Sequence, residues 1–464
     1  MVYTFQDCST TRYGGKPLPL LLAAVDELNT ALMKGEVPLV SLRGDPRPYA
    51  ADLSDILTYT VQKAEAAGRA GYIITEACFS VSHFIGTYST KIGGEVITLR
   101  LQPRWGSGML SYLLQYTSGI YQPPNAAAPM QTERDGATWL LVMLWKSLFN
   151  QALRRCHIPK EYRVRKTNDR FFRSRLDVPR QIRDNAVDQS RFACLDAPLT
   201  MDTSISRTIL QVIRLLSKAG AYPALMRDLA GYEERLAAFG VSAQVVRAEE
   251  IAKIRYTRFS IGYRPLMQAS VALLRRFGGG HDRAESLLQD TPSYLIDLAE
   301  LWENYLLAVL GRYLPARYRI FSPNHKGGEW LLEGERRQIR PDLLIEREGH
   351  VVAVLDAKFK NDTQVGRYEK DGVSREDLYQ MSTYLYHYGR TDRSLLGLFI
   401  TPVRGAPQGD VAALSRHPQH RLGVLTFDIT GWDAAGLASA SPALEQLRRA
   451  EATFAQKVLH ALEG

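Results

Sequence analysis

Residues 340–360 contain two short apolar runs separated by the polar turn 347–350, a pattern that predicts a β-hairpin. Asp342 lies near the start of the first run, and Asp356 and Lys358 lie at the end of the second. Because side chains two residues apart share one face of a strand, Asp356 and Lys358 should point the same way. A hairpin brings its two outer ends together. The pattern therefore predicts two carboxylates and one ammonium group at one end of a sheet.

Carboxylates and an ammonium group in this arrangement suit phosphodiester hydrolysis. Asp342 and Asp356 offer the hard oxygen ligands that Mg²⁺ prefers, with Mn²⁺ as a substitute, and such a metal stabilises charge on a phosphate. Lys358 can orient or deprotonate the attacking water, since the pKa of a desolvated lysine shifts readily. Asp356 ends an otherwise apolar strand, which costs stability unless its charge is paired or bound to a cation. The alternative interpretation is a surface hairpin with solvated charges.

The elements that must position these residues form an α/β pattern in the last part of the chain. Helices are predicted at residues 294–313 and 375–388, and a closing helix begins at Ser441. Apolar runs of strand length are found at 317–321, 330–333, 338–346, 351–359, 395–401 and 423–428. This order of elements predicts an α/β sandwich over residues 281–464.

The rest of the chain divides into two further parts, so the expected fold class is multidomain α/β. Residues 1–130 predict a mixed α/β N-terminal domain, with helices at 18–33 and 52–67, two strands within 84–103 and a linker at 122–130. Residues 131–280 predict a helix-rich middle domain, with helices at 139–155, 202–218, 223–238 and 258–277 before a glycine-rich break at 278–283. The length agrees with roughly three domains.

Composition narrows the class of protein. The chain has 464 residues, of which 45% are hydrophobic and 23% charged, as in folded domains rather than disordered chains, collagen or coiled-coil rods. Its four cysteines are widely spaced and its nine histidines show no HExxH pattern, so neither a zinc site nor a disulfide framework is expected. The N-terminus lacks the features of a secretion signal, and no apolar run reaches membrane-spanning length. We therefore expect a cytoplasmic protein with no membrane partner.

The positive charge is concentrated in one segment. The net charge is +9, and residues 154–183 contain eleven Lys and Arg against three acidic residues, a surplus of eight. Aromatic residues are interleaved with these cations, as in surfaces that follow a nucleic-acid backbone. The candidate DNA-binding residues are Arg163, Arg165, Lys166, Arg170 and Arg173. The alternatives are a solvated face or a surface for an acidic protein partner.

The hairpin resembles the active site of the PD-(D/E)xK nuclease superfamily, with Pro341-Asp342 and Asp356-Ala-Lys358 as its two motif elements. The resemblance implies a restriction-endonuclease-like C-terminal core. Glu303, on the preceding helix, lies where that superfamily often adds a third metal-binding carboxylate. Residues 377–384 resemble the Q-x-x-x-Y helix of RecB-like members, which implies that Gln380 positions the attacking water. Lys360 follows Lys358 and is a candidate contact to backbone phosphate.

The order of further segments resembles McrC, the nuclease subunit of McrBC-type modification-dependent restriction systems. The resemblance rests on Leu301-Trp-Glu303, the 340–342 and 356–360 segments and residues 377–381. Upstream, residues 94–104 followed by 109–114 are similar to a strand, P-K and short helix of that family, with Arg104 in place of the lysine. Residues 168–216 resemble its central helical region. The likeness covers most of residues 80–400, and the first 80 residues have no counterpart.

The resemblance implies a Mg²⁺-dependent DNA endonuclease subunit of a restriction or phage-defence complex. Its partners would be DNA, with modified cytosine as the implied target, and an McrB-like AAA+ GTPase or ATPase motor that it stimulates. The N-terminal domain would contact that motor or DNA. The chain has no GxxxxGK[ST] sequence, so we expect no nucleotide bound by the chain itself.

Two alternatives remain open. The first is an autonomous PD-(D/E)xK nuclease in defence or repair, which would cut DNA without any nucleotide. The second is a non-catalytic DNA-binding scaffold that activates a motor. The intact set of Asp342, Asp356 and Lys358 argues against the second alternative, because a retired active site is expected to lose at least one of them.

Overall fold

The structure is a computed structural model of the chain. It describes residues 1–15, 18–34, 37, 39–40, 56–66, 72–106, 109–110, 112–113, 116, 133–155, 157–218, 223–277, 293–323, 329–332, 336–359, 373–389, 393–405, 409–430 and 442–464. The predicted linker at 122–130, the break at 278–283 and Lys360 lie outside the described residues. Within the described part, no helix is long and apolar enough to cross a membrane.

Among the described residues of the N-terminal part, helix α1 (Leu18–Met33) packs on two sheets. Its elements are β1 (Val2–Gln6), β2 (Thr10–Gly14), α1 (Leu18–Met33), β3 (Leu39–Val40), β4 (Leu57–Ala66), β5 (Tyr72–Val81), β6 (Phe84–Ile92) and β7 (Glu95–Gln102). One sheet has the order β1-β7-β6-β13-β3 and the other β2-β5-β4. The helix α1 buries eight side chains against these strands, because its apolar residues recur at helical spacing.

Of the two helices and two strands predicted in this part, one helix and both strands are confirmed. Helix α1 and the β6–β7 hairpin around Gly93-Gly94 lie where the sequence indicates. The predicted helix at 52–67 is wrong, since residues 57–66 form β4 and pair antiparallel with β5. Tyr59, Thr60 and Val61 favour a strand, and pairing with the distant β5 outweighs the weak helical spacing of the apolar residues.

The middle part is helical and carries a long arm. Its helices are α4 (Glu133–Arg155), α6 (Ser204–Lys218), α7 (Pro223–Ala238), α8 (Ala248–Ala252), a 3-10 turn at Ile261–Tyr263 and α9 (Arg264–Phe277). The predicted helices agree with α4, α6, α7 and α9 to within a turn or two at their starts. Trp145 on α4 donates its indole N–H to the hydroxyl of Ser270 on α9 at 2.8 Å, which joins two helices far apart in sequence.

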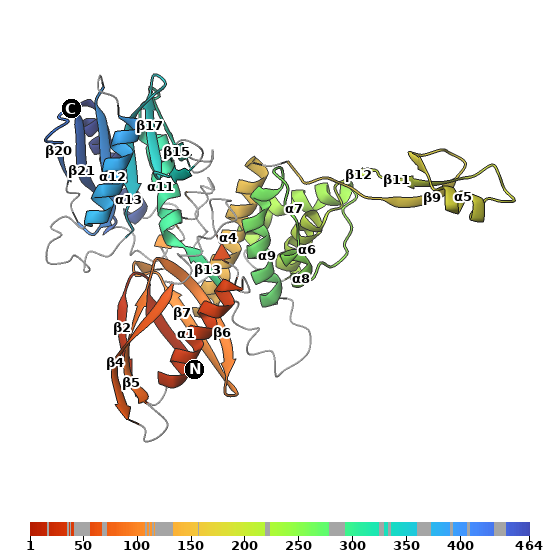
Figure 1. The fold of residues 1–464 in the computed structure, drawn as a ribbon, viewed down its shortest axis with the longest axis horizontal. Coiled ribbons are helices and arrows are strands. Elements are labelled where there is room, and N and C mark those ends of the chain that lie inside the picture. Colours follow the sequence, from red (N-terminus) through yellow and green to blue (C-terminus); the bar gives the residue numbers. More distant parts are fainter. Residues whose placement is uncertain are drawn as a thin grey trace.

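Residues 161–200, here called the arm, extend away from the helices (Figure 1). The arm contains β8 (Glu161–Tyr162), β9 (Arg165–Asp169), β10 (Arg175–Leu176), α5 (Val178–Asp184), β11 (Phe192–Asp196) and β12 (Leu199–Thr200). β11 pairs antiparallel with both β9 and β10, and β12 pairs with β8. Most of the predicted basic segment is therefore in a slender β-ribbon rather than on the surface of a helical domain.

The C-terminal part is an α/β sandwich. Its elements are β14 (Tyr318–Phe321), β15 (Glu329–Leu332), β16 (Arg336–Ile339), β17 (Leu343–Arg347), β18 (His350–Ala357), α12 (Arg375–Tyr388), β19 (Leu395–Val403), β20 (Gly409–Ala413), β21 (His420–Asp428) and α13 (Pro442–Glu463). The main sheet has the order β14-β17-β18-β19-β21-β20, with β18, β19 and β21 parallel. Helix α12 packs on one face, and α11 (Leu298–Tyr313) packs with α13 on the other.

The predicted helix at 294–313 is only partly correct. Residues 294–297 form β13, and the helix α11 begins at Leu298. β13 pairs with β6 and β3, so it completes the sheet of the N-terminal part although it comes about 200 residues later in the chain. Asp297 caps α11 by accepting the backbone N–H of Glu300 at 3.0 Å, which fixes where the strand gives way to the helix.

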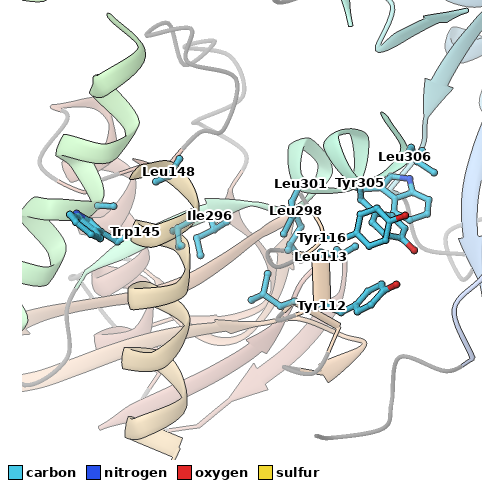
Figure 2. Packing of buried hydrophobic residues seen from close by; sticks show 14 of the residues in the cluster. Tyr112, Leu113, Tyr116, Trp145, Leu148, Ile296, Leu298, Leu301, Tyr305 and Leu306 are labelled. Atoms are coloured by element: carbon cyan, nitrogen blue, oxygen red, sulfur yellow. The ribbon is translucent and has the colours of Figure 1, made fainter. Parts of the chain in front are cut away.

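A buried carboxylate fastens the N-terminal and C-terminal parts together. Glu451 on α13 is fully buried and accepts hydrogen bonds from four tyrosine hydroxyls. They are those of Tyr112, Tyr116 at 3.2 Å, Tyr305 at 2.9 Å and Tyr313 at 3.2 Å. Figure 2 shows Tyr112 and Tyr116 gathered beside Tyr305 of α11. Burial raises the pKa of Glu451, while the hydroxyl donors oppose that rise.

Candidate active site

The predicted hairpin is confirmed as β17 and β18, joined by a tight turn. Glu348 and Gly349 have positive φ angles of 54° and 77°, as a two-residue turn between right-twisted strands requires. Leu343 is opposite Leu355 in the antiparallel register, so Asp342 and Asp356 meet at the open end of the hairpin. The Asp342 carboxylate accepts the backbone N–H of Ala357 at 2.8 Å, which fixes its orientation.

Lys358 lies between two carboxylates. Its Nζ is 2.5 Å from Oδ2 of Asp356 and 2.7 Å from Oδ1 of Asp377. All three side chains are nearly buried, with exposed fractions of 12% for Lys358, 7% for Asp356 and 9% for Asp377. Burial by itself would lower the pKa of Lys358, but the two carboxylates outweigh it and the pKa is raised. Lys358 is therefore an ammonium group at neutral pH.

Asp377 is the residue that the sequence analysis missed as part of the site. It belongs to a capping box at the start of α12, in which its Oδ2 accepts from the backbone N–H of Ser374 at 3.1 Å and from its hydroxyl at 2.8 Å. The cap occupies one carboxylate oxygen and leaves the other for Lys358. The Ser374-x-x-Asp377 spacing signals the cap, but nothing in it indicates that the helix start lies beside Lys358.

Gln380 and Tyr384 connect α12 to the segment before β17 that carries Asp342. Gln380 donates its amide N–H to the hydroxyl of Tyr384 at 2.9 Å, and that hydroxyl donates to the carbonyl of Arg340 at 3.1 Å. Burial, followed by the charges of Asp356 and Asp342, raises the pKa of Tyr384. Both aspartates therefore lie within electrostatic reach of one hydroxyl. A role for Gln380 in positioning water stays a prediction.

The oxygen donors at this site suit a magnesium ion. Asp342 and Asp356 present carboxylates at one edge of the sheet, and Mg²⁺ is commonly held by one or two carboxylates while it keeps several waters. Among the described residues there is no group of three His, Cys, Asp or Glu side chains placed to hold a metal ion. Glu303 is half-buried on α11, and its role as a third ligand stays a prediction.

The predicted DNA-binding residues are exposed on the arm, and several of them form ion pairs. Arg163 pairs with Asp202 at 3.1 Å, Arg165 with Asp196 at 3.0 Å and Arg173 with Asp169 at 3.1 Å. The whole arm, residues 161–200, contains nine Lys and Arg against six acidic residues, a surplus of three. The segment 154–183 stops short of Asp184, Asp188 and Asp196, so its surplus of eight overstates the charge of the folded arm.

The surface of the arm is also rich in exposed apolar side chains. Phe171 is 70% exposed, Phe172 60%, Ile182 69% and Val187 99%. Lys166 and Arg170 are exposed on the same ribbon. Paired charges beside exposed aromatic and aliphatic groups suit a protein surface as well as a nucleic acid. Whether the arm binds DNA remains a prediction.

Comparison with known proteins identifies the family. The family model of the McrBC 5-methylcytosine restriction system component matches residues 81–398, more than half of the chain. The chain belongs to this family. The match spans β6 to β19, and so it includes the N-terminal hairpin, the arm and all the residues of the candidate site. No curated protein sequence matches the chain.

Two solved structures of McrBC assemblies resemble the chain. The first is a half-complex from a tetradecameric assembly of Thermococcus gammatolerans McrB AAA+ hexamers with bound McrC. One chain of that complex matches this protein over 97% of this protein's length and 99% of its own, with 16% identity and a TM-score of 0.46. The second is a cryo-EM structure of the Thermococcus gammatolerans McrBC complex, matching over 68% of this chain and 88% of that chain, with 18% identity and a TM-score of 0.31.

Proposed function

We propose that this McrBC family member is the McrC-like, Mg²⁺-dependent DNA endonuclease subunit of a restriction complex, with a PD-(D/E)xK core. The observation that carries the proposal is the cluster at the end of the β17–β18 hairpin. There Asp342 and Asp356 lie together, and Lys358 is held between Asp356 and Asp377. Burying three charges at one sheet edge is costly for stability alone, so a functional reason for the cluster is favoured.

The side chains have distinct tasks in this proposal. Asp342 and Asp356 would hold Mg²⁺, which, when bound, supplies positive charge that stabilises the phosphate as it is attacked. Lys358, held between Asp356 and Asp377, acts as a cation that orients an anionic oxygen or the attacking water. Asp377 fixes the ammonium group in place from the first turn of α12, which packs on the sheet beside β18. Gln380 lines the same side of α12 and would position the water.

The partner in this proposal is an McrB-like AAA+ motor, and the substrate is DNA containing modified cytosine. The family description names a 5-methylcytosine restriction system, and McrC is bound to AAA+ hexamers in the first solved structure above. The sequence has no phosphate-binding GxxxxGK[ST] loop, in agreement with a separate motor. The arm extends away from the helices (Figure 1), a shape that suits contact with such a partner or with DNA.

The test replaces one proposed metal ligand and compares it with a neighbouring carboxylate. Asp356→Asn should lower cleavage of methylated DNA by about 10²–10³-fold, because a neutral amide holds Mg²⁺ poorly and the positive charge that stabilises the reacting phosphate is then lost. Glu346→Gln is the matched control, since Glu346 lies on the same hairpin and pairs with exposed Arg319 at 3.5 Å. Both variants should retain the far-UV circular dichroism of the wild-type chain.

The reaction should require Mg²⁺ or Mn²⁺ and stop when a chelator is added. Unchanged cutting by Asp356→Asn would reject the nuclease assignment. Assays with and without an McrB-like motor and nucleotide separate the two forms of the proposal. Cutting by the isolated chain without nucleotide would favour an autonomous nuclease, and strict dependence on both favours the restriction-complex subunit.

A further inference from the structure

The segment that follows β18 contacts both the candidate site and the N-terminal part. Lys358 contacts Asp356 and Asp377, whereas the next residue, Phe359, is buried against Trp105. The two rings meet edge to face with centroids 5.0 Å apart. The thiol of Cys8 donates to the carbonyl of Phe359 at 3.3 Å, a contact between residues 351 positions apart in sequence. Any shift of the N-terminal part at this contact would therefore displace the backbone next to Lys358.

An ion pair organises this contact from within the N-terminal part. Asp7 is completely buried, and its carboxylate accepts the backbone N–H of Arg104 at 2.5 Å, with the guanidinium Nε 3.8 Å from the other oxygen. The guanidinium lies 4.1 Å from the centre of the Trp105 ring and 5.1 Å from that of Phe359. Arg104 therefore stacks on both rings of the contact while Asp7 fixes its position.

The buried carboxyl of Asp7 and the backbone conformation of Cys8 both cost stability. This cost favours a role for the contact in setting geometry. Burial raises the pKa of the Asp7 carboxyl, and the contacts with Arg104 only partly oppose it. Cys8 has a positive φ of 48°, a conformation that costs a non-glycine residue about 1 kcal/mol or more. Burial also raises the pKa of the Cys8 thiol to about 12, so the thiol keeps its proton and can donate to Phe359. A buried ion pair contributes little net stability, and its better-supported role is to specify one arrangement.

We propose that Arg104 is a positioning residue for the nuclease site: held by Asp7, it clamps Phe359 and thereby sets the place of Lys358. The inference rests on the proposed function, because it concerns the same site. It also gives the N-terminal part a route for controlling cleavage, since moving Asp7 and Arg104 would release the backbone that carries Lys358. The Glu451–tyrosine cluster fastens the two parts independently, so loss of the Arg104 cation should not separate them.

The test uses the full chain, with its motor partner where cleavage requires one. Arg104→Met removes the cation and keeps the length of the side chain, and Arg104→Lys restores the charge. Arg12→Met is the matched control, since Arg12 forms a surface ion pair with Glu76 at 3.1 Å in the same part of the chain. Two quantities are measured: the kcat and KM of DNA cleavage, and deuterium exchange of a peptide that spans residues 353–359.

Arg104→Met should lower kcat on the order of 10²-fold, the effect of misplacing a catalytic group by about an ångström, with little change in KM. Exchange at the amides of Ala357 and Lys358 should become faster, because they are bonded to Asp342 and to the carbonyl of Ile400 at 2.8 Å. Arg104→Lys should recover most of kcat, and Arg12→Met should match the wild-type chain. Cys8→Ala, which removes only the donor to Phe359, should produce a weaker change in the same direction.

Unchanged kcat and unchanged exchange in Arg104→Met would overturn the proposal. A loss of kcat that Arg104→Lys does not restore, with the same fall in melting temperature for both variants, would also overturn it, because the residue would then be needed only for folding. If the wild-type chain does not cut DNA at all, the proposed function fails. Exchange alone then decides the positioning: faster exchange in Arg104→Met supports the clamp, and unchanged exchange rejects it.

Discussion

Carboxylate–cation pairs in the candidate active site and in the arm have similar distances but very different surroundings. In the site, Lys358 is 2.5 Å and 2.7 Å from two aspartates, and the three side chains are 7–12% exposed. In the arm, Arg165 is 3.0 Å from Asp196 and Arg163 is 3.1 Å from Asp202, yet these arginines are 56% and 54% exposed. Water screens the pairs in the arm and not those in the site.

The difference teaches that the two sets of charges serve different purposes. An exposed pair contributes about 0–1 kcal/mol, so an arginine of the arm can leave its aspartate for a phosphate or for a partner at little cost. Removing one member of a buried pair leaves an uncompensated charge and costs about 3–5 kcal/mol. The site is therefore fixed, whereas the arm is ready to exchange partners.

The largest expected effect is at Lys358. Lys358→Met should lower DNA cleavage by at least about 10³-fold and the free energy of unfolding by about 3 kcal/mol, because Asp356 and Asp377 lose their shared cation. Urea denaturation and a cleavage assay measure the two effects. Lys166→Met on the exposed arm is the control and should change stability by less than about 1 kcal/mol. Equal losses of stability in both variants would contradict the comparison.

A smaller effect is expected at Asp377, where two roles of one residue can be separated. Asp377→Asn keeps an acceptor for Ser374 but loses the charge beside Lys358, so cleavage should fall by about 10–100-fold. Ser374→Ala removes the helix cap, which should cost about 1 kcal/mol of stability and leave cleavage within about threefold of wild type. The reverse pattern, with cleavage lost in Ser374→Ala only, would show that Asp377 acts as a cap alone.

The arm should respond through binding rather than through catalysis. Replacing Arg163, Arg165 and Lys166 with Glu should weaken DNA binding and reduce the slope of log K against log salt by about 3, roughly one unit for each lost phosphate contact. Fluorescence anisotropy at several salt concentrations measures both quantities. The fall in affinity is expected to be about tenfold or more near physiological salt. If neither affinity nor slope changes, the arm contacts a protein partner or solvent instead.

The smallest expected effect is at Asp202, at the base of the arm. Asp202 is 13% exposed and accepts from Arg207, whose guanidinium is the first cause of the lowered pKa of Asp202; it also accepts from the backbone N–H of Ser242. A lowered pKa in the folded chain stabilises it at pH above the ordinary carboxyl value, and the gain is lost as pH falls below about 4.

Asp202→Asn should therefore lower the melting temperature by a few degrees at pH 7, equivalent to about 1–2 kcal/mol. The difference from wild type should shrink as the pH is lowered from 5 towards 3. Thermal denaturation followed by circular dichroism across this range checks it. A difference that is constant with pH would mean that the hydrogen-bond geometry matters and the charge of Asp202 does not.

Local patterns were sufficient to predict that Asp342, Asp356 and Lys358 lie close together, and their role in catalysis stays a prediction. Asp342, Asp356 and Lys358 lie on one hairpin, whose apolar runs and polar turn are contiguous in sequence, and α12 begins where its capping box indicates. Asp377 joins them only because α12 packs on β18, a contact that no spacing reveals. The positions of residues on one contiguous segment could therefore be predicted. A contact between two segments far apart in sequence could not.

The same reasoning explains the errors elsewhere. β4 and β13 were predicted as helical because their strand pairing depends on β5 and β6, which their own sequences do not reveal. The arm was placed in a helical domain because its basic strand and its returning strand β11 pair across more than twenty residues. Arg104 was noted only as a substitution, since its partner Phe359 is far along the chain.

The four tyrosines around Glu451 have a consequence for dividing this protein into pieces. A fragment that starts at residue 281 would contain Glu451, Tyr305 and Tyr313, but it would lose Tyr112 and Tyr116 and bring β13 without its neighbouring strands. A buried carboxylate would then lack two of its four donors, and an unpaired strand edge would face water. We therefore expect a fragment cut between the N-terminal and C-terminal parts to fold poorly. A loss of cleavage in such a fragment would be explained by its loss of structure, without any regulatory role of the missing part.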